Sequence, residues 1–328
     1  MSKLYLHLGA PKTGSTALQR NVFERIEPGK GSLLYIGKYG KNNNNFFVEL
    51  CSSINKWSLE EFLHGYKAIN EVLREKIREY PDGLLVSDES FIVVSYSING
   101  KITVKDKIDR LSKIFEGVPV ELILSIRNQV TACYSLYKEL YSNYKFLGGL
   151  SLPPRINDTW EELYATYDYS LIVDGLKSKG VVSNFYVFLY EDFQKNPSLE
   201  CEKIMDFIGF NVGSIGDIPV TNNKKTSAGM TVLPDKSLKR FVEILVLKNR
   251  LFLFVVNFPL IRNALSFFWK NFGGVLDKFR IKNNERLPLE DKDFEVIARK
   301  RFSASNRRLA SSDSFLRDAM EKYGYYLK

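Results

Sequence analysis

The segment Gly9 to Thr16, which reads GAPKTGST, places a lysine and three hydroxyl side chains around two glycines. Glycines allow a tight turn in which successive backbone N–H groups face one anion, and lysine and hydroxyl groups supply further donors. The segment therefore predicts a phosphate-binding loop, because a plain turn with an N-cap serine requires neither the lysine nor a second hydroxyl. Its candidate anion-binding residues are Lys12, Thr13, Gly14, Ser15 and Thr16.

The position of the lysine separates this loop from that of a nucleotide kinase. The spacing of the two glycines matches the pattern GxxxxGK[ST], but Ser15 stands where that pattern has its lysine. A P-loop kinase or NTPase, in which Asp88 would hold Mg²⁺ at the end of a strand, is therefore the weaker alternative.

A second anion-binding pair follows another apolar run. Arg127 comes directly after Val120–Ile126, and Ser135 lies eight residues further on. A guanidinium and a hydroxyl at the carboxyl end of a strand suit a phosphate, although a surface charge and a helix-facing hydroxyl would explain this pair taken alone. Together with the first loop, the pair favours a ligand that carries two separate phosphates.

Two residues are candidates for a general base. Glu89 follows the apolar run Leu84–Ser87, and His7 lies within the run Leu4–Leu8. A carboxylate at the carboxyl end of a strand faces the crevice where α/β proteins bind their ligands, whereas a lone strand histidine is more often a core residue. We therefore favour Glu89 over His7 and keep both as candidates.

The elements that must position these residues are short apolar runs separated by helical patterns. The runs lack strict alternation, which is typical of buried parallel strands; they are Leu4–Leu8, Leu84–Ser87, Val120–Ile126 and Phe185–Leu189. After the first run, Leu18, Val22 and Ile26 fall on one helical face, and Lys41–Asn45 reads as a loop. The order predicts a three-layer α/β fold with a mainly parallel central sheet and a helical C-terminal part.

Three segments of the chain resemble motifs of the sulfotransferases that use 3′-phosphoadenosine 5′-phosphosulfate (PAPS). LHLGAPKTGSTALQ resembles their 5′-phosphosulfate loop, and ILSIRNQVTACYS resembles their 3′-phosphate motif. FYVFLYEDFQKNPSLECEKIMDFIGF resembles a segment whose tyrosine lies near the adenosine, here Tyr190, although a core position explains Tyr190 equally well. The resemblance covers residues 4 to about 229 and is typical of bacterial, glycan-type members.

The resemblance implies a function and a role for each candidate. The chain would transfer a sulfuryl group from PAPS to a hydroxyl or amine of an acceptor, with a cell-surface or lipid-linked glycan as the expected acceptor. Lys12 would contact the 5′-phosphate and the bridging oxygen, and Arg127 and Ser135 would bind the 3′-phosphate. No metal is expected, because lysine, arginine and loop amides can neutralise the phosphates.

Composition and charge limit the expected partners and the cellular location. The 328 residues are 45% apolar and carry a net charge of +9, which favours an acidic ligand, a glycan polyanion or an anionic membrane; we expect no nucleic acid partner. The cysteines Cys51, Cys133 and Cys201 lack CxxC spacing. With no signal peptide recognised, these features predict a cytoplasmic protein.

The C-terminal third differs in pattern from the rest. We predict an α/β core over residues 1–229 and a helical extension over 230–328 packed on the same domain. The aromatic, apolar segment Phe241–Phe272 is a candidate for contact with the inner face of a membrane or a lipid-linked acceptor, and a pair of core helices explains it equally. A non-catalytic glycan- or membrane-binding protein on the same fold is the remaining alternative. The oligomeric state is left open.

Overall fold

The computed structural model of the chain describes residues 3–26, 33–40, 45–97, 100–144, 158–210, 236–237, 280–281 and 293–327. Its main sheet has five strands: β1 (Leu4–Gly9), β2 (Leu33–Gly37), β3 (Gly83–Ser87), β6 (Val120–Ile126) and β7 (Val182–Leu189). Two short antiparallel pairs are also described: β4 (Ser95–Ser97) with β5 (Gly100–Ile102), and β8 (Lys236–Ser237) with β9 (Arg280–Ile281).

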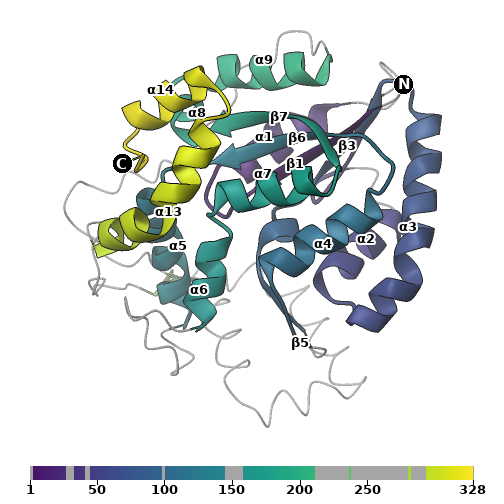
Figure 1. The fold of residues 1–328 in the computed structure, drawn as a ribbon, viewed down its shortest axis with the longest axis horizontal. Helices are drawn as coiled ribbons and strands as arrows, with labels where there is room; N and C mark the ends of the chain where they lie inside the picture. The colour runs from purple at the N-terminus through teal and green to yellow at the C-terminus, as the bar shows by residue number, and fades with distance from the viewer. Residues whose placement is uncertain are drawn as a thin grey trace. The chain divides into compact units, whose positions relative to one another are not determined.

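The five strands run parallel in the order β2-β3-β1-β6-β7. Of these strands, β1, β3, β6 and β7 are labelled in Figure 1. The central strand β1 is buried along its whole length, as expected for a parallel sheet covered on both faces. The prediction of a mainly parallel α/β sheet is confirmed, and all four predicted runs lie in its strands. The fifth strand, β2, was not predicted.

Helices connect the strands, and several of them begin at a residue that caps the helix N-terminus. Ser58 and Glu61 form a capping box at the start of α3, Thr103 and Asp106 do the same for α4, and Asn196 caps α9. The α-helices in the first two thirds of the chain are α1 (Ser15–Asn21), α2 (Asn45–Asn55), α3 (Leu59–Glu79), α4 (Val104–Ile114), α5 (Gln129–Tyr144), α6 (Asp158–Ala165), α7 (Tyr169–Ser178), α8 (Tyr190–Lys195) and α9 (Pro197–Ile208). Near the C-terminus are α13 (Asp293–Ala310) and α14 (Ser314–Lys322), and two 3-10 turns are η1 (Phe23–Arg25) and η2 (Glu89–Ile92).

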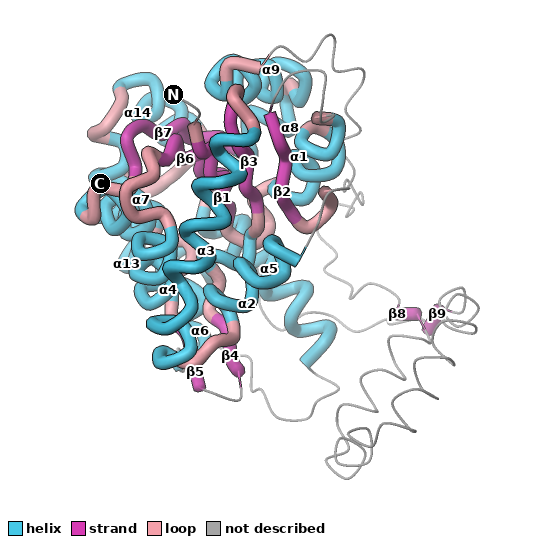
Figure 2. The backbone as a smooth tube through the Cα atoms, turned by 90° about the vertical axis from the view of Figure 1, so that its right-hand side faces the viewer, coloured by secondary structure: helices cyan, strands magenta, loops and turns pink. Residues whose placement is uncertain are grey.

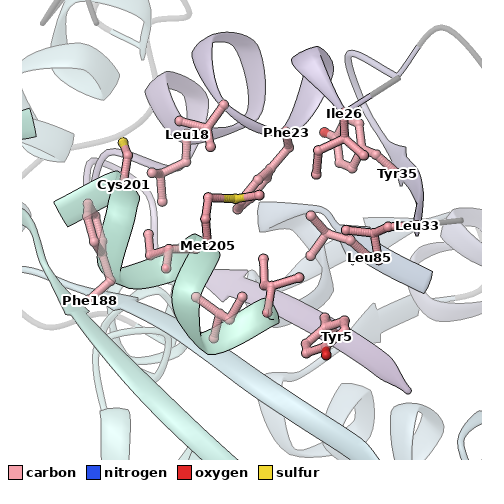
Figure 3. Packing of buried hydrophobic residues seen from close by; sticks show 14 of the residues in the cluster. Tyr5, Leu18, Phe23, Ile26, Leu33, Tyr35, Leu85, Phe188, Cys201 and Met205 are labelled. Atoms are coloured by element: carbon pink, nitrogen blue, oxygen red, sulfur yellow. The ribbon is translucent and has the colours of Figure 1, made fainter. Parts of the chain in front are cut away.

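The sheet is covered on both faces. One face packs against α1 and α9 through a cluster that includes Tyr5, Leu85, Phe188, Cys201 and Met205 (Figure 3). On the other face, α3 packs on β3 and α7 packs on β7, with α4 against α7. Figure 2 shows α1, α8 and α9 on the side of the strands opposite to α7. This is the three-layer arrangement expected from the sequence.

Local details differ from the sequence expectations. Leu18, Val22 and Ile26 are all buried, but α1 ends at Asn21 and a 3-10 turn follows, so the three do not share one continuous helix. Asn45 was expected in a loop and instead begins α2. Contacts with the sheet and with neighbouring helices decide such boundaries, and local propensity alone does not.

The chain divides into two compact units. The first comprises Met1–Ala132, Ile156–Asn222 and Glu295–Lys328 and contains the sheet; the second comprises Cys133–Arg155 and Asn223–Phe294. Within the second unit, the rings of Tyr134, Tyr137 and Phe294 pack together at centroid distances of 5.6 to 6.3 Å. The predicted boundary at residue 229 and the segment Phe241–Phe272 lie outside the described residues.

Candidate functional site

Apart from His7, the predicted site residues of the first unit lie at one edge of the sheet. The loop after β1, the turn after β3 and the turn after β6 follow the carboxyl ends of three adjacent parallel strands. Parallel strands bring these ends to the same edge, which is where open α/β sheets bind ligands.

The loop after β1 is closed by its own short-range contacts. Thr13 is fully buried, and both its backbone N–H and its Oγ1 donate to the carbonyl of Ala10, at 3.3 and 2.7 Å. The hydroxyl groups of Thr13 and Ser15 lie 3.3 Å apart. Lys12 and Gly14 both adopt a left-handed backbone, with φ of 71° and 89°. Alternation of left- and right-handed residues is the geometry that turns backbone N–H groups toward an anion.

Arg127 reaches this loop from β6. Its Nη1 donates to the carbonyl of Lys12 at 3.1 Å, and its Nε donates to the hydroxyl of Thr131 at 3.0 Å. The guanidinium carbon lies 4.6 Å above the ring of Tyr190. A Cβ placed on Gly14 would lie 3.0 Å from the same ring, so Tyr190 closes on the loop as well. Lys12, Gly14, Arg127 and Tyr190 are therefore neighbours in space.

Ser135 lies half-buried in α5 and belongs to the second unit. Its contact with the 3′-phosphate stays a prediction.

Glu89 begins the short helix η2 directly after β3. Its side chain is 32% exposed, and its Oε1 lies 3.7 Å from the Nζ of Lys38. Its neighbour Asp88 is buried and caps η2 by accepting from the N–H of Ser90 at 2.7 Å. Because β3 lies beside β1, Glu89 and Lys12 follow the carboxyl ends of adjacent strands.

His7 lies in the core of the sheet. Its Nδ1 is 2.6 Å from the hydroxyl of Ser87 and its Nε2 is 2.8 Å from that of Ser125, so both ring nitrogens are hydrogen-bonded. Gln19 also donates to the Ser87 hydroxyl, at 2.9 Å. Complete burial lowers the pKa of His7 to about 3, which leaves the ring neutral.

A buried lysine that the sequence analysis missed holds the turn after β3. The ammonium of Lys107, on α4, donates to the carbonyls of Ser90 (2.7 Å) and Val93 and to the side chains of Asn55 (2.5 Å) and Ser95 (2.6 Å). Burial lowers its pKa to about 7. The turn that carries Glu89 is thereby fixed to α2 and α4. No local motif marks Lys107, which reads as one of several charges on an amphipathic helix.

Among the residues with described placement, no group of three or more His, Cys, Asp or Glu side chains is arranged to hold a metal ion. No helix in the same part of the chain is both long and apolar enough to cross a membrane.

Comparison with known proteins gives one family match. The model of the sulfotransferase domain matches residues 5–228, which is more than half of the chain. No curated protein matches.

Two solved structures are similar at low identity. A sulfotransferase from Alicyclobacillus acidocaldarius is 13% identical, with a TM-score of 0.37, and the match covers 67% of this chain and 84% of that one. A mouse sulfotransferase in complex with PAP is also 13% identical, with a TM-score of 0.26 over 64% of this chain and 60% of that one. Both TM-scores lie below 0.5.

Proposed function

The chain belongs to the sulfotransferase domain family, and from this we propose that it transfers a sulfuryl group from PAPS to a hydroxyl or amine of a glycan acceptor. The observation that carries the proposal is the 3.1 Å hydrogen bond from Arg127 to the carbonyl of Lys12. It joins two anion-binding candidates that lie 115 residues apart in the sequence. PAPS carries a phosphosulfate and a second phosphate on one nucleoside, and this donor requires two such sites side by side.

The residues at this edge of the sheet fit such a donor. Lys12 and Arg127 supply the positive charge, the loop supplies left-handed turns and hydroxyl groups, and Tyr190 offers a ring at the same place. We assign Lys12, Thr13, Gly14, Ser15 and Thr16 to the 5′-phosphosulfate, Arg127 and Ser135 to the 3′-phosphate, and Tyr190 to the adenosine. When bound, PAPS supplies the activated sulfuryl group.

Glu89 is the proposed base. As the acceptor oxygen forms its bond to sulfur, Glu89 takes the acceptor proton, and the bond between sulfur and the phosphate oxygen breaks. Lys12 stabilises the negative charge that develops on the departing phosphate. His7 is less suited to the role of base, because both of its ring nitrogens bind serines within the core and its pKa is lowered to about 3.

The proposed acceptor is a cell-surface or lipid-linked glycan. The net charge of +9 favours a negatively charged partner. An isolated hydroxyl is a poor nucleophile, so an acceptor must be held beside both Glu89 and the sulfuryl group for transfer to occur.

Isothermal titration with adenosine 3′,5′-bisphosphate (PAP) and with ATP plus Mg²⁺ tests the donor. We expect PAP to bind without metal and ATP to bind far more weakly. Lys12→Ala and Arg127→Ala should each weaken PAP binding by about tenfold to a hundredfold, since each removes hydrogen bonds to a charged group. Lys105→Ala, an exposed position on α4, is the control and should bind PAP as the wild type does.

Two results would contradict the proposal. Unchanged PAP affinity in Arg127→Ala would remove the site for the second phosphate. Tight binding of ATP with Mg²⁺ in the absence of PAP binding would instead indicate a nucleotide kinase or NTPase.

A further inference from the structure

The segment Tyr323–Tyr325, which follows α14, contacts the turn that carries Arg127. The side-chain Nδ2 of Asn128 donates to the carbonyls of Tyr323 and Gly324, at 3.1 and 3.0 Å. Gly324 has a left-handed φ of 72°, which ends α14 and lets two successive carbonyls face one amide. Asn128, the residue next to Arg127, is therefore hydrogen-bonded to residues almost two hundred positions further along the chain.

A partly buried carboxylate forms a second link between the same two places. Glu191, in α8, accepts the backbone N–H of Asn128 at 2.8 Å with one oxygen and the hydroxyl of Tyr325 at 3.2 Å with the other. Tyr325 is 4% exposed. Burial raises the pKa of Glu191, and its hydrogen bonds and the charge of Arg127 oppose that rise. Glu191 thus bridges the turn after β6 to the end of the chain.

The backbone around Arg127 is held from further sides. The hydroxyl of Tyr169 accepts the N–H of Arg127 at 3.1 Å and donates to its carbonyl at 2.7 Å. The next residue but one, Gln129, exchanges two hydrogen bonds with the buried Asn306 of α13, at 2.7 and 3.2 Å. The guanidinium of Arg127 lies over Tyr190, at the site. Its own backbone is held by Tyr169, and the two residues that follow it are held by the C-terminal part of the first unit.

We propose that Tyr323–Tyr325 is a positioning element for Arg127 and sets the preference of the site for nucleotides that carry a 3′-phosphate. This inference rests on the proposed function, because it requires Arg127 to bind that phosphate. An arginine whose backbone is already fixed loses less conformational freedom when its side chain engages an anion. Loosening Asn128 and Glu191 therefore reduces the contribution of the 3′-phosphate to binding and leaves the 5′ side of the nucleotide unaffected.

The test compares two nucleotides that differ only in the 3′-phosphate. PAP and adenosine 5′-monophosphate (AMP) are titrated into the wild type, Tyr325→Phe and Glu191→Gln, and the folded state of each variant is checked by urea unfolding. We expect Tyr325→Phe to weaken PAP binding by about fivefold to tenfold, within the range of one ordinary hydrogen bond, with AMP affinity unchanged. Glu191→Gln should act in the same direction and serves if Tyr325→Phe fails to fold.

Tyr326→Phe is the matched control, since it removes the hydroxyl of the adjacent tyrosine, whose ring lies under Arg299. It should change neither affinity. Equal PAP affinity in the wild type, Tyr325→Phe and Glu191→Gln overturns the inference and leaves the proposed function standing. A parallel loss of PAP and AMP affinity also overturns it, because the segment would then support the whole site. A wild type that binds no PAP overturns the proposed function itself.

Discussion

Two turns carry the proposed chemistry, and they differ in the bonds that chiefly hold them. The loop after β1 is closed by bonds among its own residues, such as those from Thr13 to the carbonyl of Ala10. The turn after β3 is held by Lys107, which comes from α4 and donates to the carbonyls of Ser90 and Val93.

The difference shows in the sequence as well as in the structure. A loop that folds on itself needs glycines and hydroxyls at fixed spacing, so its residue types form a motif. A turn that is fixed by a distant side chain needs only two backbone carbonyls that point toward that side chain, and any residue provides a carbonyl. The first turn can thus be recognised from eight letters of sequence, whereas the second gives no sign of its anchor.

His7 lies in β1 and bonds Ser87 at the end of β3, so it links the two strands that lead into these turns, and disturbing it should have the largest effect. Its folded pKa of about 3 lies below the ordinary value of 6.5, so the unfolded chain binds the extra proton between these values. The contribution of His7 is fully present above pH 6.5 and is lost as pH falls toward 3. Between about pH 7 and pH 4, we expect the wild type to lose about 3 kcal/mol more unfolding free energy than His7→Gln.

Urea unfolding across that pH range measures this difference, because the carboxylates titrate equally in both proteins. His64→Gln, which changes the only other histidine, should follow the wild type. A gap between the wild type and His7→Gln that does not vary with pH would show that His7 is not a buried neutral ring.

Lys107→Met should break the second turn and leave the first intact. The methionine fills the space, but two backbone carbonyls and two side chains lose a donor, which we expect to cost about 3 kcal/mol of unfolding free energy. Lys105→Met, on the exposed face of the same helix, should stay within about 0.5 kcal/mol of the wild type. PAP affinity, which depends on the first loop, should not change. Loss of PAP binding by a folded Lys107→Met would mean that the two turns are not independent.

Glu89→Gln should affect chemistry without affecting stability or donor binding. The amide keeps the shape of the side chain and removes the basic oxygen, so transfer should slow by about 10²-fold. Transfer of label from radiolabelled PAPS to a panel of acidic and neutral polysaccharides gives the rate, and Glu75→Gln, on the exposed face of α3, is the control. Near-normal transfer by Glu89→Gln, together with its loss in a PAP-binding His7→Gln, would identify His7 as the base.

Gly14→Ala should have the smallest effect, confined to the first turn. Gly14 and Gly180 both have a left-handed φ, of 89° and 69°, so alanine at either should cost about 1 kcal/mol of unfolding free energy. A Cβ on Gly14 would also lie 3.0 Å from the ring of Tyr190, whereas one on Gly180 meets nothing within 4 Å. Only Gly14→Ala should weaken PAP binding, by about fivefold. Equal PAP affinity in the two variants would remove Tyr190 from the site.

The sequence by itself determined the features that depend on near neighbours in the chain. Buried runs without alternation predicted four strands of a parallel sheet, and parallel strands bring their carboxyl ends to one edge. That rule already placed Lys12, Glu89 and Arg127 together. The short run Leu33–Gly37 was missed, since a few apolar residues between polar segments do not distinguish a strand from a buried turn of helix.

Tertiary structure alone decided which side chains hold these residues in place. His7 is one histidine among apolar residues until strand pairing sets it between Ser87 and Ser125. Lys107 and Tyr325 have no local signal at all, because their partners lie on other elements and consist largely of backbone groups and one partly buried carboxylate. Hydrogen bonds of this kind join residues that are far apart in the sequence. Which residues meet is decided by the packing of the whole core rather than by any short segment.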